Sequence, residues 1–388
     1  MKLRTLFPFA CNDVRVGHIL FSLARHLSDT DLGAELWVMW RGPQVRKAFV
    51  RAAVPDKMGV LMRGANRLIQ PSGNWARKFL ERQYEAALQE GDLAHVYRGC
   101  SLELMRSLRS RGFPIFLECA IVMDHMAERI SFDAFARAGW PVQHNFSKAR
   151  LDAAQAQADM ADFIFSPSPA VTQSLLERGI PMGKVLEGSY GWAPERFTTT
   201  ARALPEIAGL TVLFLGSIEV RKGAHLLLDA WSKAGINGRL VLAGEMDPLI
   251  ARRCADHLRR RDVIHLPFNP DPGPVYRSAD IFAFPTLEEG SPLVGYEALG
   301  NGLPIVTSPM GAGSIIRHRT EGLVVDPHDR DQWIEALRLL AKDGDMRRAM
   351  GQAGRVRAAE FTWEKVAKRR RELINAAMVH ARKQGVPA

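Results

Sequence analysis

The stretch from Ile281 to Thr307 reads IFAFPTLEEGSPLVGYEALGNGLPIVT and shows most clearly how this chain folds. Its two ends, Ile281 to Phe284 and Pro304 to Thr307, are short apolar runs typical of buried strands. Between them a polar turn leads into a segment that we expect to be helical from near Ser291, because Pro292 has no amide to leave unpaired in a first helical turn. Strand, turn, helix and strand in this order predict part of a parallel sheet covered by helices.

The same alternation of short apolar runs and longer amphipathic segments continues on both sides of this stretch. In the first half we expect strands at Leu3 to Phe9, Glu35 to Trp40, Leu93 to Tyr97, Pro114 to Leu117 and Asp162 to Phe165, and helices at about Val14 to Leu27, Ser101 to Arg111 and Pro169 to Arg178. In the second half the further strand candidates are Thr211 to Leu215, Arg239 to Leu242, Val263 to Leu266 and Leu323 to Val325. The pattern predicts the α/β class.

A polar passage with proline and glycine, Gly188 to Gly209, interrupts the alternation and is typical of a domain boundary. We therefore expect two Rossmann-like, doubly wound parallel-sheet domains, residues 1–190 and 191–362, facing an interdomain cleft. The end of the chain reads as helical, with segments at Asp331 to Ala341, at Asp345 to Glu360 and after Thr362. We expect the last helix, residues 363–388, to pack back on the first domain.

The composition favours a globular protein with an anionic partner. The chain has 388 residues, of which 47% are hydrophobic, and a formal net charge of +10 with a pI near 9.7. A positive balance of this size favours a phosphate ester, nucleic acid or lipid headgroup over a cationic partner. The four cysteines form no CxxC motif, so neither a disulfide framework nor a structural zinc site is expected, and the cytoplasm is the expected compartment.

No apolar run is long enough to span a bilayer, since the best candidate, Phe113 to Met123, is short and carries Glu118. The segment from Arg41 to Arg82 mixes cations with apolar side chains, a composition that fits docking to an anionic membrane surface or to a lipid-linked acceptor. A solvated face or a core stripe in a basic shell explains it equally. If the membrane reading holds, the protein is peripheral at the inner face of the membrane. No nucleic-acid motif accompanies the charge, so nucleic acid is not an expected partner.

In doubly wound sheets, ligands bind outside the carboxyl ends of the strands, so the turns there can carry the chemistry. The turn after Thr211 to Leu215 reads GSIEVRKG and contains Arg221 and Lys222, which fits either a phosphate loop or an ordinary solvated turn. After Ile281 to Phe284, the free amides of Leu293 and Val294 at a helix N-terminus predict a diphosphate site.

Two glutamates accompany this second helix. Glu289 lies just before its N-terminus, where an acid is most often only a cap. Capping does not explain Glu297, which falls among apolar neighbours inside the helix.

The frame EGSPLVGYEALGNGLPIV, with seven residues between Glu289 and Glu297, resembles the acidic motif of retaining nucleotide-sugar glycosyltransferases of family 4, which have the GT-B fold. The upstream GSIEVRKGAHLLLDAW resembles their diphosphate-binding loop, and the likeness extends over roughly Ala161 to Lys368. It implies transfer of a sugar from a UDP- or GDP-sugar to a hydroxyl acceptor. We expect a glycan or lipid-linked saccharide as acceptor, in cell-surface polysaccharide synthesis.

The resemblance also implies residue roles. Lys222 would pair with the donor diphosphate, Glu297 would hold the ribose hydroxyls, and Glu289 would sit against the transferred sugar. The other donor-site residues implied are Gly17, Ser217, Arg221, Gly290, Ser291, Pro292, Leu293 and Val294.

In the first half, the histidine that the family places beyond a later strand corresponds to His125, which we expect to take part in catalysis. A lone histidine is more often structural, and His18 and His95 are alternatives. Glu118, on the preceding strand, is a further candidate.

Three positions depart from the family pattern. Ser217 stands where an arginine usually contacts the diphosphate, Ser291 and Pro292 stand where Phe-Gly is frequent, and Ser314 stands where a further glutamate is expected. These departures leave the donor identity open.

Two segments have the DxD spacing that other glycosyltransferases use to bind a metal, Asp29-Thr30-Asp31 and Asp329-Arg330-Asp331. Each falls where a helix ends or begins, which helix capping explains. We expect neither a metal nor another cofactor, because helix dipoles and Lys222 can neutralise the leaving diphosphate.

Two other functions fit the same pattern. One is a different GT-B chemistry, such as sugar epimerisation or phosphorolysis. The other is a catalytically silent subunit that binds a nucleotide-sugar or a partner enzyme, which Ser217 favours, while Lys222, Glu289 and Glu297 together favour an enzyme.

Overall fold

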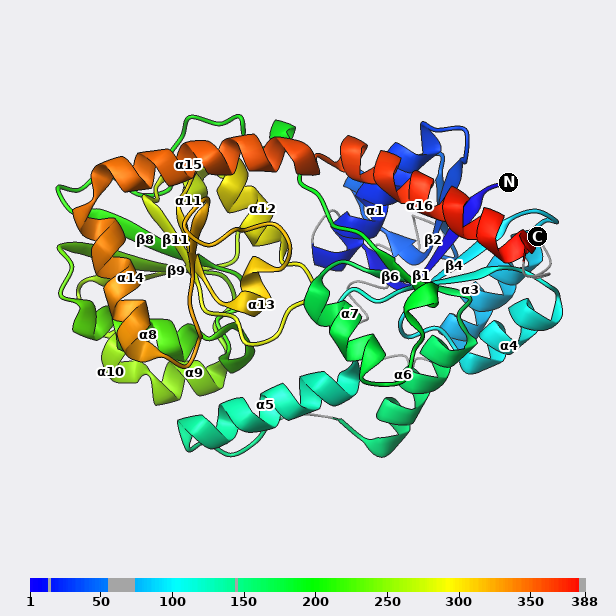
Figure 1. The fold of residues 1–388 in the computed structure, drawn as a ribbon, viewed down its shortest axis with the longest axis horizontal. Helices are drawn as coiled ribbons and strands as arrows, with labels where there is room; N and C mark the ends of the chain where they lie inside the picture. The colour runs from blue at the N-terminus through cyan, green and yellow to red at the C-terminus, as the bar shows by residue number, and fades with distance from the viewer. Residues whose placement is uncertain (13–14, 55–73, 144–145, 384–388) are drawn as a thin grey trace.

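The computed structural model describes residues 1–12, 15–54, 74–143 and 146–383. They form two α/β domains side by side, each built on a parallel sheet that is flanked by helices (Figure 1). The predicted α/β class and the two doubly wound sheets are confirmed. No helix among these residues is both long and apolar enough to cross a membrane.

The first sheet has seven strands in the order β3-β2-β1-β4-β5-β6-β7. Their bounds are β1 Leu3–Cys11, β2 Ala34–Arg41, β3 Val50–Ala52, β4 Leu93–Tyr97, β5 Ile115–Glu118, β6 Phe163–Ser166 and β7 Val185–Glu187. Five of them are the predicted strands. The two three-residue edge strands, β3 and β7, were not predicted, because so short a run shows no alternation.

Before the first passage to the second domain, the described helices that accompany this sheet are α1 Arg15–Ser28, α3 Asn74–Ala87, α4 Leu102–Ser110, α5 Asp124–Ala138, α6 Lys148–Met160 and α7 Pro169–Leu176. The sequence predicted α1, α4 and α7. Much of the basic segment from Arg41 to Arg82, residues 55–73, lies outside the described residues. The part of this segment from residue 74 onward forms the start of α3, where the side chains of Trp75 and Phe79 are exposed.

The second sheet has six strands in the order β10-β9-β8-β11-β12-β13, and all six were predicted. Their bounds are β8 Leu210–Leu215, β9 Gly238–Ala243, β10 Val263–Leu266, β11 Ile281–Phe284, β12 Ile305–Thr307 and β13 Gly322–Val324. The helices are η4 Val220–Lys222, α8 Ala224–Ala234, α9 Pro248–Arg253, α10 Ala255–Leu258, α11 Gly273–Arg277, α12 Leu293–Gly300, α13 Pro309–Ala312, α14 Arg330–Lys342, α15 Gly344–Ala358 and α16 Trp363–Lys383. The inner strands of this sheet are buried on both faces, as expected when helices cover a parallel sheet, whereas His265 on the edge strand β10 is exposed.

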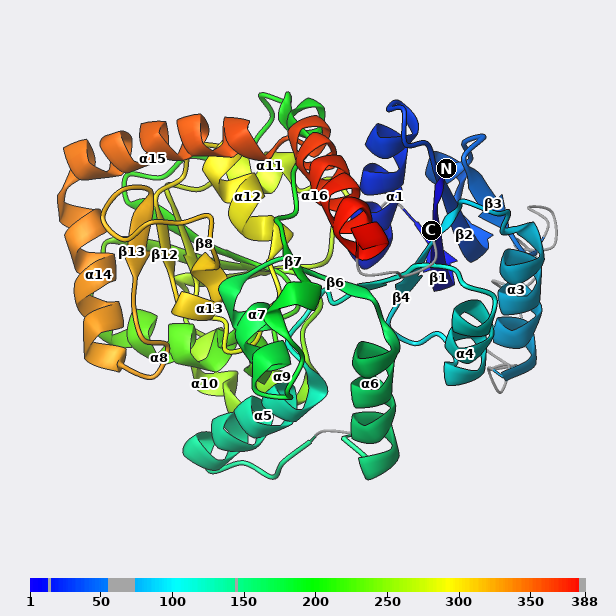
Figure 2. The same ribbon diagram turned by 45° about the vertical axis from the view of Figure 1, so that its right-hand side comes forward.

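The chain passes between the domains twice, and the two passages lie against each other. On the first passage the amide of Trp192 donates to the carbonyl of Phe361, at 3.0 Å, and the amide of Trp363 donates back to the carbonyl of Trp192 at 3.3 Å. After the second passage α16 returns to the first domain beside α1 (Figure 2). There Ile374 and Met378 join the apolar core formed with Phe116 and Phe165 of the first sheet.

The domains also touch directly. At the end of α5, Ala134 and Phe135 belong to the apolar core of the second domain. Just beyond, the rings of Trp140 and His225 lie 5.3 Å apart. Gly290 lies so close to the carbonyl of Ala120 that a Cβ atom on this glycine would overlap it. The interdomain space is therefore bounded by packed contacts.

Candidate active site

A cavity of about 490 Å³ lies between the domains, at the carboxyl ends of strands from both sheets. The second domain contributes the loops after β8, β9, β10 and β11, including Ser217, Arg221, Lys222, Glu289 and Glu297. The first domain contributes the start of α1, the end of β4 and the turn after β5. This is the position at which doubly wound domains bind ligands.

Close backbone approaches hold the loop after β8 against the loop after β11. Gly223 has φ 71°, and its Cα is packed on the carbonyl of Pro285, so that a Cβ atom would overlap it. Only glycine meets both requirements without strain. The amide of Leu287 then donates to the carbonyl of Arg221 at 2.9 Å. These contacts bring the two predicted loops together.

Lys222 and Glu289 form an ion pair across these two loops, with Nζ donating to Oε1. Their side chains are 11% and 12% exposed, so the pair is largely removed from water. Burial lowers the pKa of Lys222, although the carboxylate of Glu289 opposes this shift. A partly desolvated cation in this loop is suited to an anionic ligand.

Arg221 lines the same cavity as Ser217, which stands where the family usually has an arginine. Arg221 is therefore placed where it could substitute for that missing arginine. Its guanidinium is 2.7 Å from a carboxylate oxygen of Glu219 and 3.9 Å from one of Glu288. Despite burial, the carboxylates of Glu219, Glu289 and Glu288 raise the pKa of Arg221, and burial also raises the pKa of Glu288. The guanidinium of Arg221 is therefore paired with the carboxylates of Glu219 and Glu288 in the structure.

The helix expected from near Ser291 begins at Leu293, with Pro292 at the N-cap position. Pro292 therefore precedes the first helical residue, a small correction to the sequence-based boundary. The first-turn residues Leu293 and Val294 line the cavity, where their amides have no acceptor within the helix. Ser291 shares a hydrogen bond of 2.7 Å with the hydroxyl of Tyr296, which fixes the entry to the helix.

Glu297, on α12, has its carboxylate tied to α11. Its Oε2 accepts a hydrogen bond of 2.9 Å from the hydroxyl of Tyr276. Burial raises the pKa of Glu297, against the opposing effects of that hydrogen bond and of Arg196 and His18. The carboxylate thus faces the cavity from a fixed side chain.

His18 and Arg196 complete this side of the cavity. A guanidinium nitrogen of Arg196 lies 3.1 Å from Nδ1 of His18, joining α1 of the first domain to the segment after the first passage. His18 was only an alternative in the sequence, and Arg196 and Tyr276 were not predicted. No local sequence signal identifies Arg196, because its partner is 178 positions away.

The structure does not bring His125 to this cavity. It lies in the first turn of α5 and lines a separate cavity of about 150 Å³. There its Nε2 is 3.6 Å from a carboxylate oxygen of Glu177. The turn after β5 delivers Ala120 and Ile121 to the interdomain cavity, and α5 then carries His125 away from it. The expected contact of His125 with donor or sugar does not fit this placement.

The remaining candidates are structural or peripheral. Gly17 lies in α1, packed on the backbone of Asn12, and its neighbours Val16 and His18 line the cavity in its place. Glu118 is buried and bonded to His95, Tyr190 and Arg370. His95 is part of the same buried network. Gly290 forms the contact with the first domain rather than a wall of the cavity.

The DxD segments lie outside the cavity. Asp329 caps α14 by accepting from the amide of Gln332, which confirms its expected capping role. Asp31 follows α1 and is 2.8 Å from Arg371. Across the part of the chain that the structure describes, no cluster of three His, Cys, Asp or Glu side chains is arranged to hold a metal ion.

Residues 209–343 match the family model described as "Glycosyl transferases group 1". This segment runs from β8 to the end of α14 and contains Lys222, Glu289 and Glu297.

Two curated relatives show how far the sequence likeness extends. The chain is 38% identical over 105 residues to a D-inositol 3-phosphate glycosyltransferase of Corynebacterium kroppenstedtii, covering 27% of this chain and 23% of that protein. It is 31% identical over 204 residues to the enzyme of that name from Thermobispora bispora, covering 48% and 47%. The chain therefore spans less than half the length of either relative.

Solved structures extend the likeness to the whole fold. Sucrose-phosphate synthase from Thermosynechococcus elongatus superposes with a TM-score of 0.72 at 19% identity, covering 98% of this chain and 99% of that one. Anabaena HepE in complex with UDP superposes with a TM-score of 0.70 at 14% identity, covering 97% and 100%. These superpositions confirm the expected GT-B fold.

Proposed function

We propose that this protein is a retaining glycosyltransferase of family 4 that moves a sugar from a nucleotide-sugar to a hydroxyl acceptor. The strongest support is that Lys222, Glu289, Glu297 and the N-terminus of α12 line one interdomain cavity. The match of residues 209–343, which contain these three side chains, to glycosyl transferases group 1 also supports the proposal.

These residues contact different parts of the nucleotide-sugar donor. The diphosphate lies at the amides of Leu293 and Val294, where the helix dipole favours negative charge. Lys222 adds a charge-assisted contact, so the leaving diphosphate is neutralised without a metal ion. Glu297, held by Tyr276, accepts from the ribose hydroxyls, and Glu289 faces the transferred sugar, where a carboxylate favours developing oxocarbenium charge.

Retention follows from front-face departure of the diphosphate as the acceptor hydroxyl attacks. A donor phosphate oxygen takes the acceptor proton, and the new glycosidic bond forms on the face that the diphosphate leaves. UDP is the first nucleotide to test, because HepE, with the same fold, has been crystallised with UDP. We propose a glycan or lipid-linked saccharide as acceptor and a cytoplasmic enzyme that reaches the inner membrane face peripherally.

The test combines binding and turnover. Thermal shift against UDP, GDP and ADP identifies the base, because a ligand that binds only the folded state raises the apparent stability. Hydrolysis of the corresponding nucleotide-sugar then separates an enzyme from a silent binding subunit. Binding with no turnover, with or without acceptors, would favour the silent subunit. No stabilisation by any nucleotide would contradict the donor assignment itself.

A further inference from the structure

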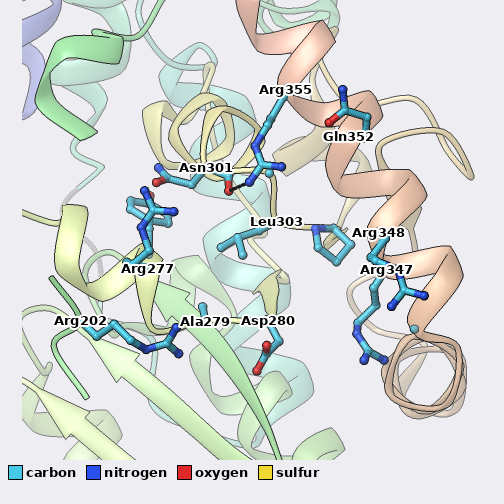
Figure 3. A pocket seen from close by; sticks show the side chains of 14 residues that line it. Arg202, Arg277, Ala279, Asp280, Asn301, Leu303, Arg347, Arg348, Gln352 and Arg355 are labelled. Atoms are coloured by element: carbon cyan, nitrogen blue, oxygen red, sulfur yellow. Dashed lines mark hydrogen bonds between the residues drawn. The ribbon is translucent and has the colours of Figure 1, made fainter. Parts of the chain in front are cut away.

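A second cavity, of about 660 Å³, lies in the second domain and shares no lining residue with the interdomain cavity. We call it the arginine cavity, because five arginines line it: Arg202, Arg277, Arg347, Arg348 and Arg355. Figure 3 shows Arg202 and Arg277 on one side of Leu303, and Arg347 and Arg348 on the other. The arginines thus surround a common space from several elements.

The charge in this cavity is strongly unbalanced. The lining contains one acidic residue, Asp280, whose Oδ2 already accepts from the amide of Thr211 at 2.8 Å. Arg202 and Arg348 pair with Glu206 and Asp345, whose side chains are 77% and 93% exposed. Such surface pairs contribute little and exchange readily with other anions.

The other three arginines have no carboxylate partner among the described residues. Arg277 donates to the carbonyl of Thr199 at 3.3 Å, Arg355 to that of Asn301 at 3.1 Å, and Arg347 to that of Ala341 at 3.0 Å. The buried Nε of Arg277 has no hydrogen-bond partner in the described part of the chain. None of these three guanidinium groups is therefore neutralised by a carboxylate of the described chain, although each is oriented by a backbone carbonyl.

Arg355 is held in place before any ligand arrives. Gly302 has φ 73°, and a Cβ atom there would overlap the guanidinium of Arg355, so this group packs directly on the glycine backbone. The carbonyl of Asn301, next to it, orients the same guanidinium. Preorganisation of this kind reduces the conformational entropy lost on binding.

We propose that the arginine cavity binds a phosphate-bearing anion. Guanidinium groups match phosphate oxygens bidentately, and several of them approaching from different sides suit a group with three or four acceptor oxygens. The cavity volume falls within the range of roughly 300 to 1,000 Å³ typical of ligand sites. The ligand is either a soluble phosphate ester or the headgroup of an anionic lipid, since both present this chemistry.

The direct test is calorimetric titration of the full-length chain with inorganic pyrophosphate. A Lys222→Ala background weakens binding in the interdomain cavity, so the two sites are distinguished. In that background, Arg277→Gln with Arg355→Gln removes two of the three cavity arginines that have no carboxylate partner among the described residues. The matched control is Arg252→Gln with Arg253→Gln, which removes the same charge from exposed positions on α9.

We expect the control to bind pyrophosphate like its background, and the cavity variant to bind at least tenfold more weakly. If the cavity variant fails to fold, Arg202→Gln with Arg348→Gln, at the rim, should still weaken binding at least threefold. Cosedimentation with phosphatidylglycerol vesicles, with phosphatidylcholine vesicles as the uncharged control, then shows whether the ligand is a lipid headgroup or a soluble phosphate ester. A lipid headgroup gives sedimentation that the arginine substitutions abolish, and a soluble ester gives none. Pyrophosphate binding equal to that of the control in both arginine variants would overturn the site.

Discussion

Lys222 donates a hydrogen bond from Nζ to Oε1 of Glu289, so the cation assigned to the diphosphate and the carboxylate assigned to the sugar are direct partners. Both side chains are largely buried. A donor diphosphate that enters the cavity must therefore share Lys222 with Glu289. Substituting either residue also leaves the other without its partner.

Lys222→Ala should weaken nucleotide-diphosphate binding by about 1.5 to 3 kcal/mol, because a charge-assisted contact is lost. Lys233→Ala is the matched control, since Lys233 lies on α8 and pairs with Asp229 at 2.6 Å on the surface. Calorimetry with the nucleotide found by thermal shift measures both variants. Equal affinities would remove Lys222 from the donor site.

Glu297→Gln should mainly raise the donor KM. In the proposed donor complex the carboxylate holds the ribose equally in the ground and transition states, so its loss would be a loss of uniform binding. The amide is nearly isosteric, and its oxygen can still accept from Tyr276. Steady-state kinetics at several donor concentrations measure the effect, and a fall in kcat with unchanged KM would contradict it.

Glu289→Gln should lower kcat by about 10²-fold or more, with little change in nucleotide affinity. In the proposed mechanism, positive charge develops on the sugar only as the glycosidic bond breaks, so the carboxylate would act in the transition state. The same donor and acceptor are used as for Glu297→Gln, and each variant serves as the control for the other. An effect on KM alone would require this role of Glu289 to be withdrawn.

Activity should survive treatment with EDTA, because α12 and Lys222 are assigned the neutralisation of the leaving group. Initial rates are compared before and after chelation and after adding back manganese or magnesium. Loss of activity on chelation, restored by either metal, would show that the diphosphate needs a cation that these residues do not replace.

Gly290→Ala should separate the domains, since its Cβ would overlap the carbonyl of Ala120. The expected results are a larger radius of gyration in small-angle scattering and at least a tenfold fall in activity, with each domain still folded. Gly183→Ala is the control, because a Cβ at Gly183 meets no atom within 4 Å. Identical scattering from the two variants would show that the contact at Gly290 yields without moving the domains.

Stability should depend on pH through His225, whose pKa burial lowers to about 4, with a smaller contribution from His328. Folding favours neutral His225, so its contribution is fully present above pH 6.5 and is lost as the pH falls from 6.5 towards 4. The loss amounts to about 3 kcal/mol at most. His225→Gln should unfold in urea with a smaller difference between pH 7 and pH 4.5 than wild type. His380→Gln, at an exposed position on α16, should retain the wild-type difference.

The sequence predicted most of the second domain because its strands are continuous apolar runs and its loops carry local signals. The six strands, α14, α15 and α16 were all expected, and the helix after Glu289 began within two residues of its predicted start. The first domain was harder. Strands β3 and β7 are too short to show a pattern, and α5 and α6 have weak apolar periodicity. Because α5 was not predicted, nothing in the sequence indicated that His125 lies on a helix that leads away from the interdomain cavity.

The candidate site was predictable only where its residues lie in one local motif. Lys222, Glu289 and Glu297 each belong to such a motif, yet their mutual contacts depend on two loops that meet at Gly223 and Pro285. His18, Arg196 and Tyr276 join the site through tertiary contacts between distant segments, which a single sequence does not reveal.

The paired passages at Trp192 and Phe361 have a mechanical consequence. Two segments bonded to each other resist sliding and stretching more than one segment does, so we expect the domains to move relative to each other mainly by a swing about this double hinge. The wall of the interdomain cavity near Tyr190, two residues before Trp192, lies next to this axis and should move least. If the cavity opens to exchange a ligand, we expect the opening at the far rim, while the hinge side keeps its shape.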